Sequence, residues 1–122
     1  MNEQSEKSAW IGIVGPCSAG KSTLIEALEA QGYAARHIAQ DHSYVPDMWQ
    51  RLVNPRLLIY LDVSYAESMR RRPLDMSPGE FEEQCRRLRH AFEHADYYIS
   101  TDGQSPEEVL YAVVNFLTNA DI

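Results

Sequence analysis

The sequence has few cysteines, no long apolar run and no excess of positive charge. Its two cysteines, Cys17 and Cys85, lack the spacing of metal ligands or of a disulfide framework, which predicts a protein of the reducing cytoplasm. No apolar segment approaches the roughly 18 residues of a membrane span, so no membrane association is expected. The opening residues, MNEQSEKSA, lack an apolar signal core and predict a disordered polar tail over residues 1–9.

The net charge is negative, at −7 with histidine neutral. Proteins that bind nucleic acid through its phosphates usually carry a basic excess, so nucleic acid is not an expected partner. A small anionic ligand is compatible with this charge, because a local pocket can be positive within a negative whole. The 122 residues suffice for one domain with a real core, which we assign to residues 10–122.

Apolar runs and helix-capping patterns alternate along the chain. Short β-rich runs predict strands at 10–14, 33–39, 56–63 and 96–100. Helical spacing, and the capping boxes SYAE, SPGE and SPEE, predict helices at 21–32, 45–53, 64–72, 77–95 and from 105 onward. This alternation predicts an α/β fold of three layers, with a parallel sheet of four or five strands and helices on both faces.

The first loop of this fold carries the most specific motif. Residues 15–22, GPCSAGKS, fit the pattern G-x-x-x-x-G-K-[ST] between a predicted strand and a predicted helix, which is typical of a phosphate-binding loop. Glycines let successive backbone N–H groups point into one cavity, and the start of the helix adds partial positive charge. Cys17 is interpreted as a small residue that the loop tolerates. The predicted ligand-binding residues are Gly15, Ser18, Ala19, Gly20, Lys21, Ser22 and Thr23, with Lys21 on the outer phosphates and Ser22 on Mg²⁺.

Three stretches resemble the P-loop kinases of small molecules, which include the nucleoside, nucleotide and dephospho-coenzyme A kinases. They are IGIVGPCSAGKSTLIEALEAQG, HIAQDHSY, and the C-terminal half from LLIYLDVSYAESMRRR through RRLRHAFEHADYYISTDGQSPEEVLYAVVNFL. The resemblance implies a kinase-like P-loop NTPase fold, ATP and Mg²⁺ as cofactors, and transfer of the γ-phosphate to a small metabolite. It also implies that the loop 101–105 lies near the base. The guanine-reading pattern N-K-x-D is absent, which favours ATP over GTP by the same resemblance.

The chain also departs from these kinases. Few residues separate Asp41 from the strand that begins near Leu57, so one strand and the acceptor-binding region are missing or much reduced. This leaves an alternative function open, a nucleotide-binding module that is non-catalytic, or a slow NTPase, with a regulatory role. A third interpretation is a loop that holds a non-nucleotide anion, or a chain that acts as a homo-oligomer through exposed sheet surface.

Two aspartates follow predicted strands. Asp41 is the best candidate for a general base or for a contact to Mg²⁺-bound water, although a plain turn aspartate fits its sequence equally well. Asp62 ends LLIYLD, a pattern typical of an aspartate that orders Mg²⁺. In the kinases that the chain resembles, the aspartate of this strand is instead usually structural.

Arginines, histidines and aromatic residues complete the candidates. Arg70, Arg71 and Arg72 are adjacent on a predicted helix, so at most two can face one pocket, and Arg72 is favoured as the catalytic phosphate clamp because it is nearest the lid-like turn. A solvated basic face is the alternative. His90 and His94 have helical spacing but lack further metal ligands, so a surface pair is expected. Tyr44 and Trp49 are candidates either for stacking on a ligand or for the core.

Overall fold

The computed structural model describes residues 7–71 and 76–122. The strands are β1 (Ile11–Val14), β2 (Ala35–His37), β3 (Leu57–Asp62) and β4 (Tyr97–Ser100). The helices are α1 (Lys21–Ala30), α2 (Met48–Leu52), α3 (Tyr65–Arg71), α4 (Pro78–Arg87), α5 (Arg89–His94) and α6 (Pro106–Asn119), with a short 3₁₀ helix at Gln40–His42. The predicted α/β architecture is confirmed at this level, and the sheet has four strands among the described residues.

The four strands run parallel in the order β2-β1-β3-β4. The chain passes from β1 to β2 on one side and then crosses back over β1 to reach β3 on the other side. The strand order therefore reverses between β1 and β3, and in parallel sheets of this kind a ligand crevice forms at that point, outside the carboxyl ends of the strands. The loop that follows β1 begins at this crevice.

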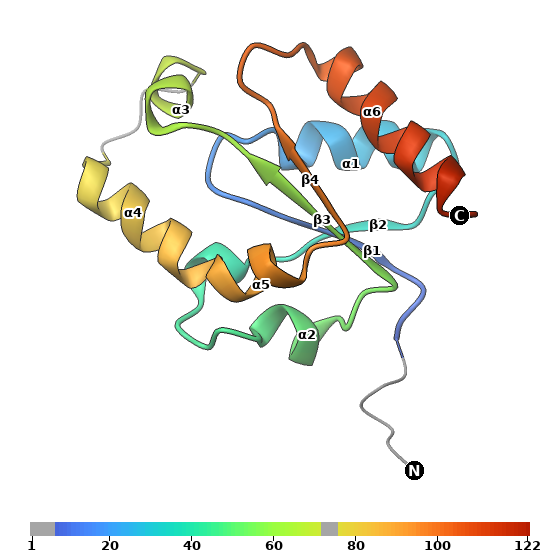
Figure 1. Ribbon diagram of the computed structural model, residues 1–122, viewed down its shortest axis with the longest axis horizontal. Helices are drawn as coiled ribbons and strands as arrows, with labels where there is room; N and C mark the ends of the chain where they lie inside the picture. The colour runs from blue at the N-terminus through green and yellow to red at the C-terminus, as the bar shows by residue number, and fades with distance from the viewer. Residues whose placement is uncertain (1–6, 72–75) are drawn as a thin grey trace.

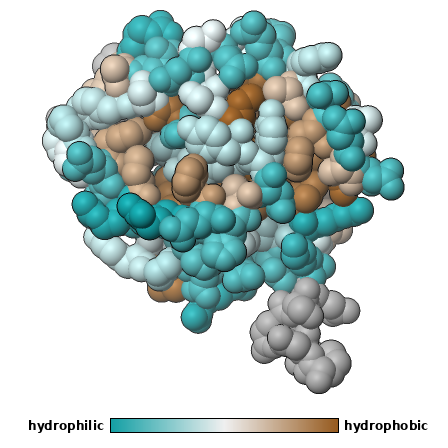
Figure 2. All heavy atoms as spheres, viewed as in Figure 1, coloured by the Kyte–Doolittle hydropathy of each residue, from teal (hydrophilic) through white to brown (hydrophobic). Residues whose placement is uncertain are grey.

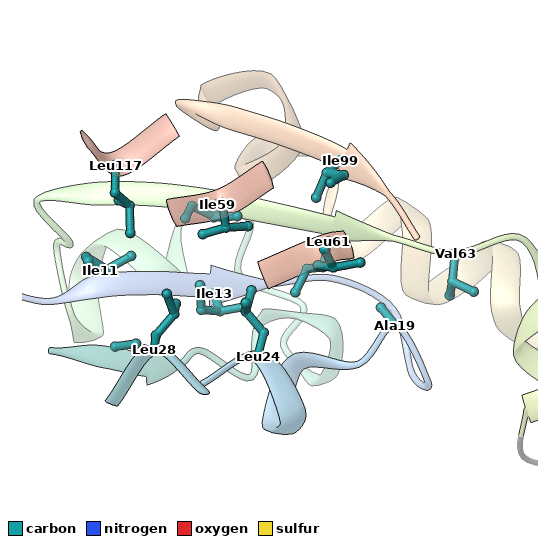
Figure 3. Close-up of a cluster of buried hydrophobic side chains, with 13 residues drawn as sticks. Ile11, Ile13, Ala19, Leu24, Leu28, Ile59, Leu61, Val63, Ile99 and Leu117 are labelled. Carbon is teal, nitrogen blue, oxygen red and sulfur yellow. The ribbon is translucent and has the colours of Figure 1, made fainter. Parts of the chain in front are cut away.

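One face of the sheet packs against α1 and α6 (Figure 1). Ile59 and Leu61 point to this side, because alternate strand residues face opposite ways. Leu28 of α1 is fully buried in the same cluster. Figure 3 shows these apolar side chains converging from strands and helices into one cluster. On the C-terminal helix α6, Val113 and Leu117 are both fully buried against this face.

The opposite face packs against α2, α4 and α5, which gives the three layers of Figure 1. Leu58 and Tyr60 point to this side, and they pack with Trp49 of α2 and with Leu88 and Ala91. Because both faces are covered, β3 has the near-continuous apolar run LLIYL rather than an alternating pattern.

Two expectations differ from the structure. The helix predicted over residues 77–95 is two helices, because the chain turns at Leu88, which is fully buried and joins α4 to α5. Phe92, which lies in α5, is half exposed and packs edge-on against Tyr60 and Tyr98. The predicted tail lies partly outside the described residues, and Ser8 is docked through a hydrogen bond from its backbone N–H to the carbonyl oxygen of Asn54 (2.8 Å).

The surface in Figure 2 is mostly polar, and apolar side chains appear on it in separate small patches. No helix in the described part of the chain has both the length and the apolar character that crossing a bilayer requires.

Candidate functional site

The glycine loop, residues 15–22, connects the carboxyl end of β1 to α1. Gly15, Ser18 and Gly20 have φ angles of +153°, +67° and +93°. A Cβ atom on Gly15 would lie 1.9 Å from the carbonyl oxygen of Leu61, so only glycine fits against β3 at this point. Ser18 is a non-glycine residue with positive φ, a conformation that is costly and concentrated at functional sites. The motif predicted from the sequence thus has a tightly curled backbone, as a phosphate loop requires.

Helix α1 begins without a capping side chain. Gly20 is its N-cap residue, no side chain in the described segments caps it, and no acidic residue lies in its first turn. In contrast, α4 and α6 both begin with complete capping boxes, at Ser77 and Ser105. The free N–H groups at the start of α1 therefore remain available for an anion.

Lys21 lies over the loop. Its Nζ atom donates hydrogen bonds to the carbonyl oxygens of Gly15 and, at 3.0 Å, Pro16. Burial lowers the pKa of Lys21, and the nearby Asp41 and Cys17 offset part of that effect. The ammonium is held at the mouth of the loop, where phosphate oxygens can replace the two carbonyls as its acceptors.

Gln40 fixes the segment that carries Asp41. The Gln40 side chain is fully buried, and its Oε1 atom accepts a hydrogen bond from the backbone N–H of Trp49 (2.7 Å). Its Nε2 atom donates to the carbonyl oxygens of Val45 (2.9 Å) and Arg87 (3.2 Å). These bonds close the 40–49 loop on itself and join it to α4. The sequence reasoning missed Gln40, because a buried glutamine has no local pattern that distinguishes it from an exposed one.

Asp41 is buried at the exit of β2 and faces the glycine loop. Its Oδ2 atom lies 3.4 Å from His42 Nε2 and 4.0 Å from Cys17 Sγ. Its Oδ1 atom is also buried and has no hydrogen-bond partner within the described segments. A buried carboxylate oxygen without a partner is costly, which points to a ligand or a proton donor that arrives from outside. Asp41 lies in the 3₁₀ turn Gln40–His42, and its carboxylate accepts no backbone N–H from the described residues.

Arg71 is the arginine that reaches the loop. Its Nη1 atom donates to the carbonyl oxygen of Ser18 (3.1 Å) and to Thr101 Oγ1 (2.9 Å), and its Nη2 atom donates to the Thr101 carbonyl oxygen (2.5 Å). Its Nε atom pairs with Glu67 four residues earlier, at 3.0 Å. Arg72, predicted as the clamp, lies outside the described residues. Glu67 pairs with Arg70 as well, so its spacing does not distinguish the two arginines, and the contact of Arg71 with Thr101 does.

A pocket of about 560 Å³ lies beside the glycine loop. Its walls come from the loop and the start of α1, from the end of α3, and from the segment after β4. The lining residues are Ser18, Ala19, Gly20, Thr23, Leu24, Glu67, Arg70, Arg71, Thr101, Gly103, Gln104, Pro106 and Val109. The loop 101–105, which the resemblance placed near the base, therefore forms one wall of this pocket. Ser22 lies on the other side of α1, where it lines an open groove with His37 and Arg36.

The hydrogen bonds of the Asp62 carboxylate go to Val63 and Tyr98 and not to the glycine loop. Its Oδ1 atom accepts the backbone N–H of Val63 (2.9 Å), and its Oδ2 atom accepts the hydroxyl of Tyr98 (2.6 Å). It lines a separate pocket with Cys85 on the α4–α5 side of the sheet. Each oxygen accepts one hydrogen bond within the protein, so the carboxylate joins the ends of β3 and β4, and the magnesium role of Asp62 stays a prediction.

The remaining candidates are structural. Trp49 is buried, and its Nε1 atom donates to His90 Nδ1 (3.0 Å), so it belongs to the core and not to a stacking site. This bond fixes the proton of neutral His90 on Nε2, which removes the lone pair that a metal would need there. The described residues hold no cluster of three or more metal-ligating side chains.

Tyr44 is 78% exposed and packs over the guanidinium of Arg87, 4.3 Å from the ring centre.

Comparison with known proteins gives no assignment. No protein-family model matches the chain, and no curated protein or solved structure matches it either.

Proposed function

We propose that this chain is a P-loop protein of the kinase-like fold that binds Mg-ATP and transfers the γ-phosphate to a small metabolite. The observation that carries the proposal is the glycine loop itself. It lies at the carboxyl end of β1, where the strand order reverses, and it joins a curled backbone to an uncapped helix and a lysine held at its mouth.

The loop residues divide the work of binding the triphosphate. The backbone N–H groups at Gly20 and at the start of α1 would face the phosphate oxygens, and Lys21 would place its charge on the outer phosphates. Ser22 is exposed in the first turn of α1, and its hydroxyl is the group that would hold Mg²⁺. Bound Mg²⁺ supplies charge neutralisation on the phosphate oxygens. Thr23 is exposed beside the neighbouring pocket and would contact the innermost phosphate.

The pocket of about 560 Å³ next to the loop is the proposed site of the nucleoside. Its volume is in the range of about 300–1,000 Å³ that is usual for small-ligand pockets. Leu24, Pro106 and Val109 give it apolar surface for a base, and Thr101 and Gln104 add polar groups. Arg71 connects the pocket wall that follows β4 to the glycine loop, because it donates hydrogen bonds to both Thr101 and Ser18.

Asp41 is the proposed general base. Phosphoryl transfer depends mainly on positioning and charge neutralisation, so one carboxylate near the acceptor hydroxyl suffices to take its proton. Asp41 has a free buried oxygen, and it lies close enough to Lys21 to influence that pKa. The proton acceptor and the phosphate-binding ammonium therefore share one edge of the glycine loop.

The test is calorimetric titration with Mg-ATP, followed by a panel of metabolites as acceptors. Lys21→Ala is expected to weaken Mg-ATP binding by about tenfold or more with the fold intact, because its ammonium faces the ligand. The chain has two lysines, so Lys7→Ala is a control with the same change in charge, and it is expected to bind Mg-ATP as the wild type does. Equal affinity of the two variants, or no binding by the wild type, would contradict the proposal.

A second candidate function is a nucleotide-binding module without transferase activity. The observation that favours it is the short connection between β2 and β3, which contains only the 3₁₀ helix and the five residues of α2. That connection leaves little chain to bind an acceptor. Tight Mg-ATP binding without consumption of ATP on any acceptor would favour this module over the kinase.

A further inference from the structure

Cys17 lies on the glycine loop and is held from two helices. Its backbone N–H donates to Gln84 Oε1 (3.1 Å), and its Sγ atom accepts a hydrogen bond from Gln84 Nε2 (3.1 Å). Its carbonyl oxygen accepts the hydroxyl of Ser68 in α3 (3.2 Å). The residue is only partly buried. Helices α3 and α4 are thus fastened to the phosphate loop through one cysteine.

The surroundings of the thiol favour reaction there. The Gln84 amide donates to the sulfur, and a donor in that position stabilises the negative charge that the sulfur carries when it attacks another group. A second observation is independent of these. Asp41 is 2% exposed, lies beside the thiol, and has an Oδ1 atom without a partner in the described parts of the chain. A group that arrives at Cys17 with an N–H donor would satisfy that oxygen.

The second cysteine is in a different setting. Cys85 lies on α4 in the pocket that also contains Asp62. Burial, followed by the negative charges of Asp62 and Glu82, raises the pKa of the Cys85 thiol. Cys85 is therefore expected to stay protonated and unreactive at neutral pH, and it serves as an internal reference.

We propose that Cys17 is a site of reversible modification by small peptide disulfides, with oxidised glutathione as the probe, and that the modification closes the glycine loop to phosphate. The Cys17 sulfur attacks one sulfur of the disulfide, the new S–S bond forms as the old one breaks, and the leaving glutathione takes the proton that Cys17 loses. One thiol and one disulfide give one mixed disulfide and one thiol, so no other oxidant is needed. The peptide N–H groups of the attached glutathione are the donors for Asp41.

The attached tripeptide fills the mouth of the loop beside Lys21 and brings net negative charge there, because its two carboxylates outweigh its one ammonium. Both effects act against an incoming triphosphate, by repulsion and by occupying the mouth of the loop. Modified protein is expected to bind Mg-ATP more weakly by about tenfold or more. This consequence rests on the proposed function, whereas the selective reaction of Cys17 does not.

The experiment incubates the full chain with oxidised glutathione at neutral pH and locates the added mass by peptide mapping. Glutathione is expected on Cys17 and not on Cys85, to be removed by a reducing agent, and its attachment is expected to be slowed by saturating Mg-ATP. Cys17→Ser should remain unmodified, and Cys85→Ser should react as the wild type does.

Equal labelling of the two cysteines, or faster labelling of Cys85, would overturn the proposed site. Full Mg-ATP affinity in the modified protein would overturn the claim that modification closes the loop. The proposed function is tested separately, because it is the unmodified wild type that must bind Mg-ATP. A chain that labels on Cys17 but never binds ATP refutes the nucleotide and leaves the reactive thiol established.

Discussion

Replacing Gly15 with alanine tests the packing of the glycine loop against β3. The alanine Cβ would lie 1.9 Å from the Leu61 carbonyl oxygen, whereas real Cβ atoms essentially never approach within 3.0 Å of such an atom. That oxygen belongs to the backbone of the central strand β3 and cannot rotate away. The loop must therefore move by about 1 Å, and alanine must also adopt a φ near +153°, which L-residues rarely do.

Two costs add for Gly15→Ala. Forced overpacking against a buried backbone and an unfavourable φ each cost about 1–3 kcal/mol, so a loss of about 3 kcal/mol in the free energy of unfolding is expected. For a chain of this size that corresponds to a fall in Tm of roughly 10 °C. Binding of Mg-ATP should fall as well, because the displaced loop no longer presents its N–H groups as one cavity.

Gly32→Ala is the matched control. Gly32 has a φ of +95°, and a Cβ atom added there would meet no other atom within 4 Å, so alanine at this position incurs only the backbone penalty of about 1 kcal/mol. Thermal unfolding followed by circular dichroism compares the two variants with the wild type. If Gly15→Ala loses no more stability than Gly32→Ala, the close contact between the loop and Leu61 is refuted.

Three further changes test other parts of the site. Asp41→Asn should lower turnover with the acceptor found in the metabolite panel by about 100-fold and leave Mg-ATP affinity nearly unchanged; equal losses in kinetics and calorimetry would contradict the base role. Arg71→Ala should cost about 2 kcal/mol in urea unfolding because it removes hydrogen-bond partners from Thr101, whereas Arg70→Ala, at an exposed position, should cost clearly less; equal costs would refute the role of the Arg71–Thr101 contact. The hydrogen bond to Asp62 raises the pKa of Tyr98 to about 12, so its contribution to stability is complete below about pH 10 and lost as the pH rises toward 12. Tyr98→Phe should flatten that loss in alkaline unfolding curves, and an unchanged slope would count against the bond.

Local patterns predicted the elements because their causes are local. The Ser77 and Ser105 capping boxes form in full, since each depends on residues three apart. The box at Ser64 forms only in part. Its hydroxyl accepts the backbone N–H of Glu67, but the Glu67 carboxylate pairs with arginines and not with the N-cap. The Ser64 backbone N–H donates instead to Asp102 Oδ1 (3.0 Å), and this long-range contact replaces the second half of the box.

The sequence predicted the site residues whose positions the backbone motif fixes, and it missed those whose positions depend on tertiary contacts. The curled loop and Lys21 follow from the spacing of glycines and lysine alone. The choice of Arg71 depends on Thr101, thirty positions along the chain, and the use of Asp62 depends on Tyr98 from the neighbouring strand. The position of Arg72 next to a lid-like turn, or of Asp62 at the end of a strand, does not predict these contacts.

The position of Trp49 gives the molecule its own optical reporter. Its backbone N–H donates to Gln40, the neighbour of Asp41, and its indole N–H donates to His90. Its fluorescence emission therefore depends on the geometry of the 40–49 loop, which carries Asp41. The other indole, Trp10, is 37% exposed and lies near Arg36 at the sheet edge, and Trp10→Phe would remove its background. Events at the mouth of the loop can then be followed in real time by fluorescence, without a dye or a coupled enzyme.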